Sequence, residues 1–288
     1  MFAFCTILAG ILWGLISIFL RSLTAAGFSS LQILFLRGAV SALFVAIIIL
    51  FRNPKLFKIQ LKDLWMFIGT GVVSLTFFSL CYFKTILETG TSIAVILLYT
   101  SPIFILVFSR FLFKEKITVP KLLALILTFA GCILVSGIAG GKGMSLKGFI
   151  IGLGAGLGYG LYSIFSRYAL KKYDSLTVTF YTFVFSSISI IPFCKIQNIP
   201  SILNWKSGLF ILGIALFCTV LPYIFYTFGL SGLETGKAAI LVTVEPLVGT
   251  LVGFLLWKEE VSVLKIIGIV LIFAAIILCS WNPKNTKG

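Results

Sequence analysis

The stretch Gly14-Leu-Ile-Ser-Ile-Phe-Leu-Arg21 occurs a second time in this chain, as Gly160-Leu-Tyr-Ser-Ile-Phe-Ser-Arg167. Six of the eight positions are identical, and the copies stand 146 residues apart in a chain of 288 residues. The segment Glu88-Thr-Gly90 returns at the same spacing as Glu234-Thr-Gly236. This internal repeat predicts a fold of two structurally related halves, because repeated sequence reports repeated structural units.

A third set of residues extends the repeat toward the end of each half. After a slip of two residues, Pro102, Lys114-Glu115 and Lys121 return as Pro246, Lys258-Glu259 and Lys265. The glycine-rich stretch 140–143 lies between the halves. We therefore expect two domains, residues 1–140 and residues 147–282.

The composition indicates a membrane protein. Hydrophobic residues make up 60% of the chain and charged residues 11%, against about 25% charged in soluble domains. The apolar runs are continuous and do not alternate with polar residues, so they predict helices and exclude a β-barrel. We expect an all-α membrane protein in contact with the lipid bilayer.

Ten apolar segments are long enough to cross a bilayer, which takes about 20 residues of helix. The first has no basic segment before it and no convincing cleavage site after it, so we read it as a retained span. The predicted spans are 2–20, 31–51, 64–83, 91–112, 120–139, 147–166, 176–194, 207–227, 235–257 and 263–281.

The loop charges predict the orientation of these spans. With both termini in the cytoplasm, fourteen lysines and arginines face the cytoplasm and eight face outward, as the positive-inside rule requires. Five spans separate the two copies of the repeat. Because five is odd, the halves have opposite orientations, which makes ten transmembrane helices in two inverted five-helix repeats, an arrangement typical of secondary transporters.

Several function classes are disfavoured by composition. The net charge of +15 resides in short loops, so we attribute it to topology and expect no nucleic-acid partner. The chain has no histidine, and its six cysteines lie in or at the ends of apolar segments without a Cys-x-x-Cys pair. We expect no metal, no cofactor and no catalytic residues, and hence no enzyme.

Two charged residues lie inside predicted spans, where a charge is costly and suggests a function. Glu245 precedes Pro246 at the middle of the ninth span, and its carboxylate could bind a cation, a proton or a substrate ammonium. The alternative is a structural anchor bonded to nearby helices. Arg37 lies about a third of the way into the second span; it either reaches toward the membrane surface or faces the interior and binds a carboxylate.

Aromatic side chains with a polar group occur repeatedly within the spans, where a buried phenol needs a hydrogen-bond partner. Trp13 and Tyr159 occupy matching positions of the repeat, so both are expected to approach the centre from opposite halves. Packing between helices is the alternative role for each ring. With Arg37 and Glu245, the candidate substrate-binding residues are Trp13, Tyr82, Tyr99, Tyr159, Tyr162 and Tyr223.

Two further patterns concern packing. Lys84 and Glu88 stand four residues apart and can pair on one helix face. The glycines of Gly152-x-x-x-Gly156-x-x-x-Gly160 share a face, which predicts close helix packing either within a monomer or between the subunits of a homodimer.

Together these residues resemble the drug/metabolite transporter superfamily in its ten-span EamA-type branch. The resemblance is carried by Leu12-Trp13-Gly14, Leu36-Arg37 and Tyr99-Thr-Ser-Pro102 through Phe113-Lys-Glu115, and in the second half by Val244-Glu-Pro246 through Trp257-Lys-Glu259. It implies a central cavity lined from the first, third, fourth, sixth, eighth and ninth helices. Matched to this chain, that cavity would include every aromatic candidate above and Glu245, whereas Arg37 has no charged counterpart in the seventh span.

The resemblance implies a secondary transporter of the plasma or inner membrane. Members of the branch mostly export amino acids, metabolites or drugs, and some import. We therefore expect an exporter of amino acids or small organic metabolites or drugs by alternating access. The alternatives are an importer of a small organic solute and a structural or assembly subunit that transports nothing.

Overall fold

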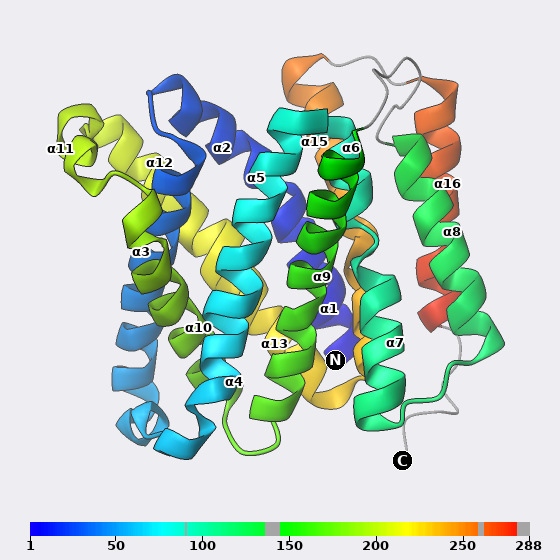
Figure 1. Cartoon of the computed structure of the whole chain (residues 1–288), viewed down its shortest axis with the longest axis horizontal. Coiled ribbons are helices and arrows are strands. Elements are labelled where there is room, and N and C mark those ends of the chain that lie inside the picture. Colours follow the sequence, from blue (N-terminus) through cyan, green and yellow to red (C-terminus); the bar gives the residue numbers. More distant parts are fainter. Residues whose placement is uncertain (90, 136–144, 259–261, 281–288) are drawn as a thin grey trace.

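The computed structural model describes residues 1–89, 91–135, 145–258 and 262–280, and every secondary-structure element among them is helical (Figure 1). The expected boundary between the domains, at residues 140–143, lies outside the described residues. So do Glu259 of the repeated Lys-Glu pair and Trp281, the last residue of the predicted tenth span. The description below concerns the remainder of the chain.

The first half contains five helical units in sequence order. The first, third and fourth units are each divided into shorter helices. The elements are α1 (Phe2–Gly14), α2 (Ile16–Ala25), α3 (Ser30–Arg52), η1 (Pro54–Phe57), η2 (Leu61–Asp63), α4 (Leu64–Ile68), η3 (Gly69–Thr76), α5 (Phe77–Thr89), α6 (Thr91–Leu98), α7 (Ser101–Phe113) and α8 (Val119–Val135).

The second half repeats this plan. Its third and fourth units are divided at the places that correspond to those of the first half. The elements are α9 (Leu146–Ala169), α10 (Ser175–Ile190), η4 (Ile191–Phe193), η5 (Ile196–Asn198), α11 (Ile199–Ile202), α12 (Trp205–Ala215), η6 (Leu216–Val220), α13 (Leu221–Gly232), α14 (Thr235–Leu241), η7 (Val242–Val244), α15 (Glu245–Trp257) and α16 (Val263–Ser280).

Eight of these units are long and apolar enough to cross a membrane, and two shorter apolar helices accompany them. The chain is therefore an all-helical, multi-pass membrane protein, as the composition predicts. The long units are Phe2–Ala25, Ser30–Arg52, Leu61–Thr89, Ile93–Phe113, Leu146–Ala169, Ser175–Phe193, Trp205–Gly232 and Thr235–Trp257, and the shorter ones are Val119–Val135 and Val263–Cys279.

Polar side chains fix where several helices begin. The Ser29 hydroxyl accepts from the backbone N–H of Gln32, and the Gln32 side chain accepts from the N–H of Ser29 in return, at 2.9 Å. Ser145 and Asp174 cap α9 and α10 in the simpler way, with a side-chain oxygen that accepts one N–H of the first turn. These caps satisfy donors that a helix start otherwise leaves unpaired.

The two halves are inverted relative to each other. In Figure 1, α1 rises from the lower end of the bundle, whereas α9, at the matching place of the second half, descends from the upper end. We call the upper end, where α2 is followed by α3, the α2–α3 end. The lower end, where α9 is followed by α10, is the α9–α10 end.

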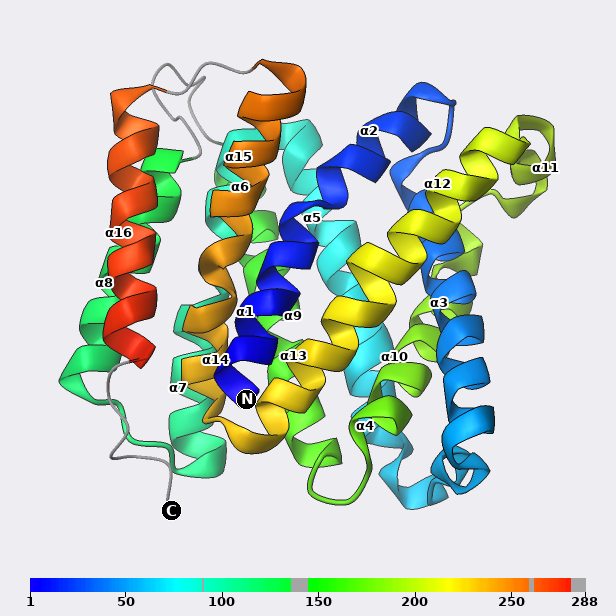
Figure 2. The ribbon, with the colours of Figure 1, turned by 180° about the vertical axis from the view of Figure 1, so that it is seen from behind.

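Helix packing follows the same symmetry. Helix α1 of the first half packs against α13 of the second half. The helices that correspond to them in the repeat, α9 and α5, also pack against each other. Helix α3 packs against its own counterpart α10, and α8 packs against its counterpart α16 at one edge of the bundle, side by side in both views (Figures 1 and 2). The most extensive helix contacts therefore join the two halves, and each hydrophobic cluster contains residues of both.

Irregular backbone also recurs at matching places. Wide π-helical turns interrupt the third unit at Gly69–Thr76 and the eighth at Leu216–Val220. The fourth unit breaks before Pro102, and the ninth breaks over the short 3₁₀ turn Val242–Val244 before Pro246. Proline lacks a backbone N–H and cannot continue the preceding turn, so both breaks follow from the doubled prolines.

The predicted spans are close to the observed helices except in the first, third and eighth units; the first, expected at 2–20, continues to Ala25. The third was expected at 64–83 and the eighth at 207–227, but the helices run over Leu61–Thr89 and Trp205–Gly232. Helical backbone continues through Lys84 and Glu88, whose charge ended the apolar window. The apolar pattern reports the membrane-embedded part of a helix, not its end.

The ion pair expected within one helix is wrong. Glu88 pairs with Lys147 at 3.0 Å, at the start of α9, and not with Lys84. The side chains of Glu88 and Lys147 both retain contact with solvent, with exposed fractions of 31% and 65%. Helical spacing does not reveal this partner, because Lys147 lies on a different helix from Glu88.

The glycine face of α9 packs within the monomer. A Cβ atom added at Gly152 would lie 2.2 Å from a Leu97 methyl carbon, and one at Gly156 would lie 2.3 Å from the Thr100 hydroxyl. At Gly160 the nearest atoms belong to α7. This face is therefore occupied by α6 and α7 of the same chain.

Candidate functional site

A cavity of about 180 Å³ lies at the centre of the bundle, between helices of both halves. Its lining extends from Tyr159 and Glu245, in the second half, to Leu20 and the exposed Ser30 at the α2–α3 end. For comparison, an engineered cavity of about 150 Å³ in another protein binds benzene. The space suits one small organic molecule.

Glu245 reaches this cavity because the ninth unit is broken. Helix α14 ends at Leu241, and α15 begins at Glu245 itself, with Pro246 in its first turn. The first turn of a helix favours a negative charge, since its N–H groups and dipole are positive toward that end. The Tyr159 hydroxyl donates a hydrogen bond to Glu245 Oε2 at 3.3 Å, so this carboxylate joins α15 to α9 within the second half.

Arg37 lines the same cavity from α3. Of the two positions considered for this side chain, at the membrane surface or in the interior, the structure has the interior one. The residue 146 positions later is Phe183, which is fully buried and packs edge-on against Tyr223. The inverted repeat therefore places one cation, not two, on this side of the cavity.

Arg37 and Glu245 face one cavity without forming a direct ion pair. Among the described residues, no nitrogen of Arg37 lies within 4.0 Å of a Glu245 oxygen, the limit for an ion pair. A guanidinium and a carboxylate thus border the space from different helices. Such a pair can hold an anionic and a cationic group of one ligand.

Aromatic rings form the wall between these charges. Trp13 packs edge-on against Tyr223 with ring centroids 5.1 Å apart, and Phe78 contacts Tyr82 at 5.8 Å and Tyr159 at 5.3 Å. All five rings line the cavity. Trp13 and Tyr159, which match in the repeat, meet here from opposite halves.

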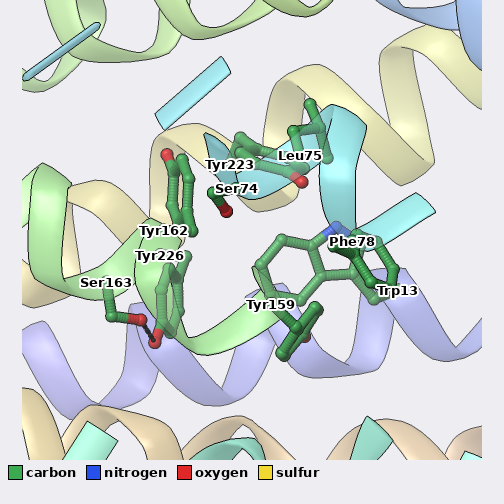
Figure 3. Close-up of a pocket in the computed structure, with 9 residues that line it drawn as sticks. All are labelled: Trp13, Ser74, Leu75, Phe78, Tyr159, Tyr162, Ser163, Tyr223 and Tyr226. Atoms are coloured by element: carbon green, nitrogen blue, oxygen red, sulfur yellow. Dashed lines mark hydrogen bonds between the residues drawn. The ribbon is translucent and has the colours of Figure 1, made fainter. Parts of the chain in front are cut away.

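A smaller cavity of about 20 Å³ lies next to the large one and shares Trp13, Phe78, Tyr159 and Tyr223 with it (Figure 3). Tyr162 belongs to this second space. In Figure 3, Trp13, Phe78 and Tyr159 gather on one side, and Tyr162, Tyr226 and Ser163 on the other. The four shared rings therefore separate two compartments.

The structure brings together seven of the eight residues predicted from the sequence. Tyr99 is buried directly after α6 but lines neither of these two cavities. It stands just before the break at Pro102. The six that line the large cavity are Trp13, Arg37, Tyr82, Tyr159, Tyr223 and Glu245, and Tyr162 lines the small one.

Phe78 and Tyr226 are lining residues that the sequence analysis did not select. Phe78 stands four residues before Tyr82, so helical spacing could have found it. Tyr226 stands three residues after Tyr223 on the same helix and could have been found in the same way. Ser74 gave no signal, because a serine inside an apolar helix is common and its carbonyl partner, Gly158, is distant in sequence.

Residues that could hold a metal ion do not cluster. Among the described residues, no three histidine, cysteine, aspartate or glutamate side chains are close enough to share a metal ion. The site is thus built of one cation, one anion and aromatic rings.

The sequence as a whole matches a known family in two consecutive segments. Residues 1–137 and residues 146–281 each match the EamA-like transporter family, so the match covers nearly the entire chain. The chain belongs to the EamA-like transporter family. This membership, within the drug/metabolite transporter superfamily, confirms the resemblance noted from the sequence and the architecture of two repeats.

Relatives of this EamA-like transporter agree with the assignment. A protein of Archaeoglobus fulgidus named as an uncharacterized transporter is 26% identical over 279 residues, which cover 96% of this chain and 94% of the relative. YetK of Bacillus subtilis, also named as an uncharacterized transporter, is 24% identical over 78% of this chain and 70% of its own length. The EamA-like chain is thus similar to transporters from an archaeon and a bacterium.

The fold is shared with a solved structure. A protein crystal structure superposes with a TM-score of 0.82 over 100% of this chain and 99% of that chain, at 17% sequence identity. At that identity the likeness concerns the fold alone. This EamA-like protein is a membrane transporter and not an enzyme, and its substrate is a small molecule.

Proposed function

We propose that this transporter exports amino acids or closely related small organic metabolites by alternating access. The observation that carries the proposal is the placement of Arg37 and Glu245 on one cavity, between aromatic rings. A guanidinium recognises a carboxylate in a planar, two-pronged geometry, and a carboxylate recognises an ammonium. A zwitterion presents both groups.

The aromatic wall supports the same substrate class. Trp13, Tyr82 and Tyr159 offer flat apolar surface for the side chain of an amino acid. Electron-rich ring faces also attract an ammonium group. The proposed binding set has eight residues, of which Tyr99 stands beside the helix break before Pro102. They are Trp13, Arg37, Tyr82, Tyr99, Tyr159, Tyr162, Tyr223 and Glu245.

The proposed mechanism follows from the inverted repeats. Two halves of opposite orientation can exchange shapes, so that the cavity opens first to one side of the membrane and then to the other. The loop charges favour cytoplasmic termini, with the α9–α10 end inside the cell. Export is the direction that the family resemblance implies for most members.

Counterflow in proteoliposomes tests the proposal. Vesicles loaded with an unlabelled amino acid should accumulate the same amino acid, radiolabelled, against its gradient, and a panel of amino acids and their amine and acid analogues defines the class. Glu245→Gln should reduce counterflow at low substrate at least about tenfold, since a charged hydrogen bond contributes about 1.5–3 kcal/mol.

Glu88→Gln is the matched control, because it makes the same chemical change at an exposed site outside the cavity. Its counterflow should equal that of the natural protein. Failure of every zwitterion in the panel, with folded protein present in the vesicles, would contradict the proposed substrate class.

A further inference from the structure

We infer that Arg167 and Arg21 are paired gate residues: Arg167 holds the α9–α10 end closed in this structure, and Arg21 closes the α2–α3 end in the opposite conformation. This inference rests on the alternating access proposed above. The two arginines line neither cavity, and the experiment measures shape without substrate.

At the α9–α10 end, Arg167 joins α9 to the end of α13. Its guanidinium donates to the backbone carbonyls of Leu230 and of Leu233, the latter at 2.9 Å. Helix α13 ends at Gly232, so these carbonyls belong to its last turn and to the residue after it. A cation is favourable there, because carbonyl groups at a helix end lack helical partners and carry partial negative charge.

Two buried contacts continue the same seam toward the cavities. The Tyr162 hydroxyl pairs with Thr227 Oγ1 at 2.7 Å. Ser163 Oγ pairs with the Tyr226 hydroxyl at 2.8 Å, the dashed line in Figure 3. All three interactions join α9 to α13. These contacts hold α9 against α13, and they are the closed gate of this inference.

The repeat assigns a counterpart to the arginine of this seam and to the two carbonyls that it binds. Arg167 corresponds to Arg21, and the carbonyls of Leu230 and Leu233 correspond, 146 residues earlier, to those of Lys84 and Leu87 in α5. At the α2–α3 end, residues next to these counterparts line the large cavity from two different helices, α2 and α5. Its lining includes Leu20, the neighbour of Arg21, and from α5 it includes Tyr82 and Phe83, which precede Lys84.

Arg21 occupies a different position from Arg167. It is exposed, and its guanidinium lies over the Trp257 ring, 4.1 Å from the ring centroid. The repeated arginine therefore binds the end of α13 at the α9–α10 end, as Arg167, and stacks on the Trp257 ring at the α2–α3 end, as Arg21. Exchanging the shapes of the two halves would take Arg167 off α13 and bring Arg21 to Lys84 and Leu87, in the C-terminal part of α5.

The hydroxyl pairs of the α9–α10 end are not doubled. Leu80 and Cys81 occupy the positions that correspond to Tyr226 and Thr227. The arginine is thus the polar element that both gates share. The two hydroxyl pairs of the α9–α10 end have no counterpart at positions 80 and 81, and they favour the conformation in which this end is closed.

Distance measurements between spin labels test the inference. In a variant with the six cysteines replaced by alanine, one label pair at Lys171→Cys and Ser231→Cys reports on the α9–α10 end. A second pair at Ala25→Cys and Leu87→Cys reports on the α2–α3 end. All four positions are exposed.

Arg167→Ala should add a longer-distance population at the first pair and a shorter one at the second. We expect that population to rise about tenfold or more, because the loss of one charged hydrogen bond suffices for such a change. Adding Arg21→Ala should reverse the shift, since it removes the contact that the opposite conformation gains. Arg110→Ala, an exposed arginine of α7 near the same end, is the control and should leave both distances unchanged.

Unchanged distances in Arg167→Ala, or equal shifts in Arg110→Ala, would overturn the inference. So would a double variant that behaves like Arg167→Ala alone. If Arg167→Ala does not fold, Tyr226→Phe weakens the same seam and should shift the distances in the same direction. Counterflow is measured separately, so a protein that changes shape but carries no amino acid would refute the proposed function and leave the gates standing.

Discussion

Arg37→Gln and Glu245→Gln are expected to change ligand selectivity in opposite ways. Three probes separate the two charges: phenylalanine, phenethylamine, which lacks the carboxylate, and 3-phenylpropionate, which lacks the ammonium. Arg37→Gln should weaken binding of phenylalanine and leave phenethylamine unchanged. Glu245→Gln should weaken binding of phenylalanine and leave 3-phenylpropionate unchanged.

The size of each effect follows from the geometry of the cavity. The two charges line one space of about 180 Å³ and are not paired directly with each other. A ligand group therefore meets each charge without first breaking an ion pair between them. A hydrogen bond to a charged group contributes about 1.5–3 kcal/mol, which corresponds to roughly 10- to 150-fold in dissociation constant.

Calorimetric titration of purified protein measures these constants, and thermal shifts give an independent ranking, because a ligand that binds only the folded state stabilises it. Lys206→Gln and Glu88→Gln remove exposed charges outside the cavity and serve as controls. The reasoning fails if Arg37→Gln weakens phenethylamine as much as phenylalanine. That result would mean that Arg37 shapes the cavity without touching the carboxylate.

Two other predictions concern stability. The Glu115 carboxylate accepts from the N–H and hydroxyl of Thr235, at 2.7 and 2.8 Å, and from the N–H of Gly236 at 3.2 Å. Glu115→Gln should therefore lower the free energy of unfolding by about 1.5–3 kcal/mol, measured by detergent-induced unfolding. An unchanged unfolding midpoint would show that these hydrogen bonds to Glu115 do not stabilise the protein. Gly156→Ala should lower it by about 1–3 kcal/mol through overpacking against Thr100. Gly208→Ala, with open space around its Cβ, should be neutral or raise it by up to about 1 kcal/mol, and equal effects of the two substitutions would refute the packing argument.

Much of the architecture could be predicted because the relevant physics is local in sequence. Continuous apolar runs predict spans, and the count of spans between repeats predicts inversion. The doubled prolines at 102 and 246 predict helix breaks, since proline disrupts a helix wherever it stands. Residues inside such a break, Glu245 above all, could be selected on charge alone.

Features that depend on a distant partner could not be predicted. Glu88 was matched with Lys84 because helical spacing supplies only neighbours on the same helix, whereas its partner Lys147 is on another. The roles of Tyr162 and Tyr99 depend on how α9 and α6 are rotated, which sequence spacing does not fix. The glycine face of α9 left two partners open, and only the packing of α6 and α7 decided between them.

The π-helical turns at Gly69–Thr76 and Leu216–Val220 each take up an extra residue without rotating the helix that follows. An α-helix advances about 100° per residue, and a π turn accommodates roughly one residue more per turn than an α turn. Deleting one residue inside either turn would therefore restore regular helix and leave Phe78 and Tyr82, or Tyr223 and Tyr226, facing the cavity. A one-residue deletion in the regular helix has no such turn to absorb it and would rotate the residues beyond it by about 100°. The π turns are thus the places in the third and eighth units where a change in length disturbs the cavity wall least.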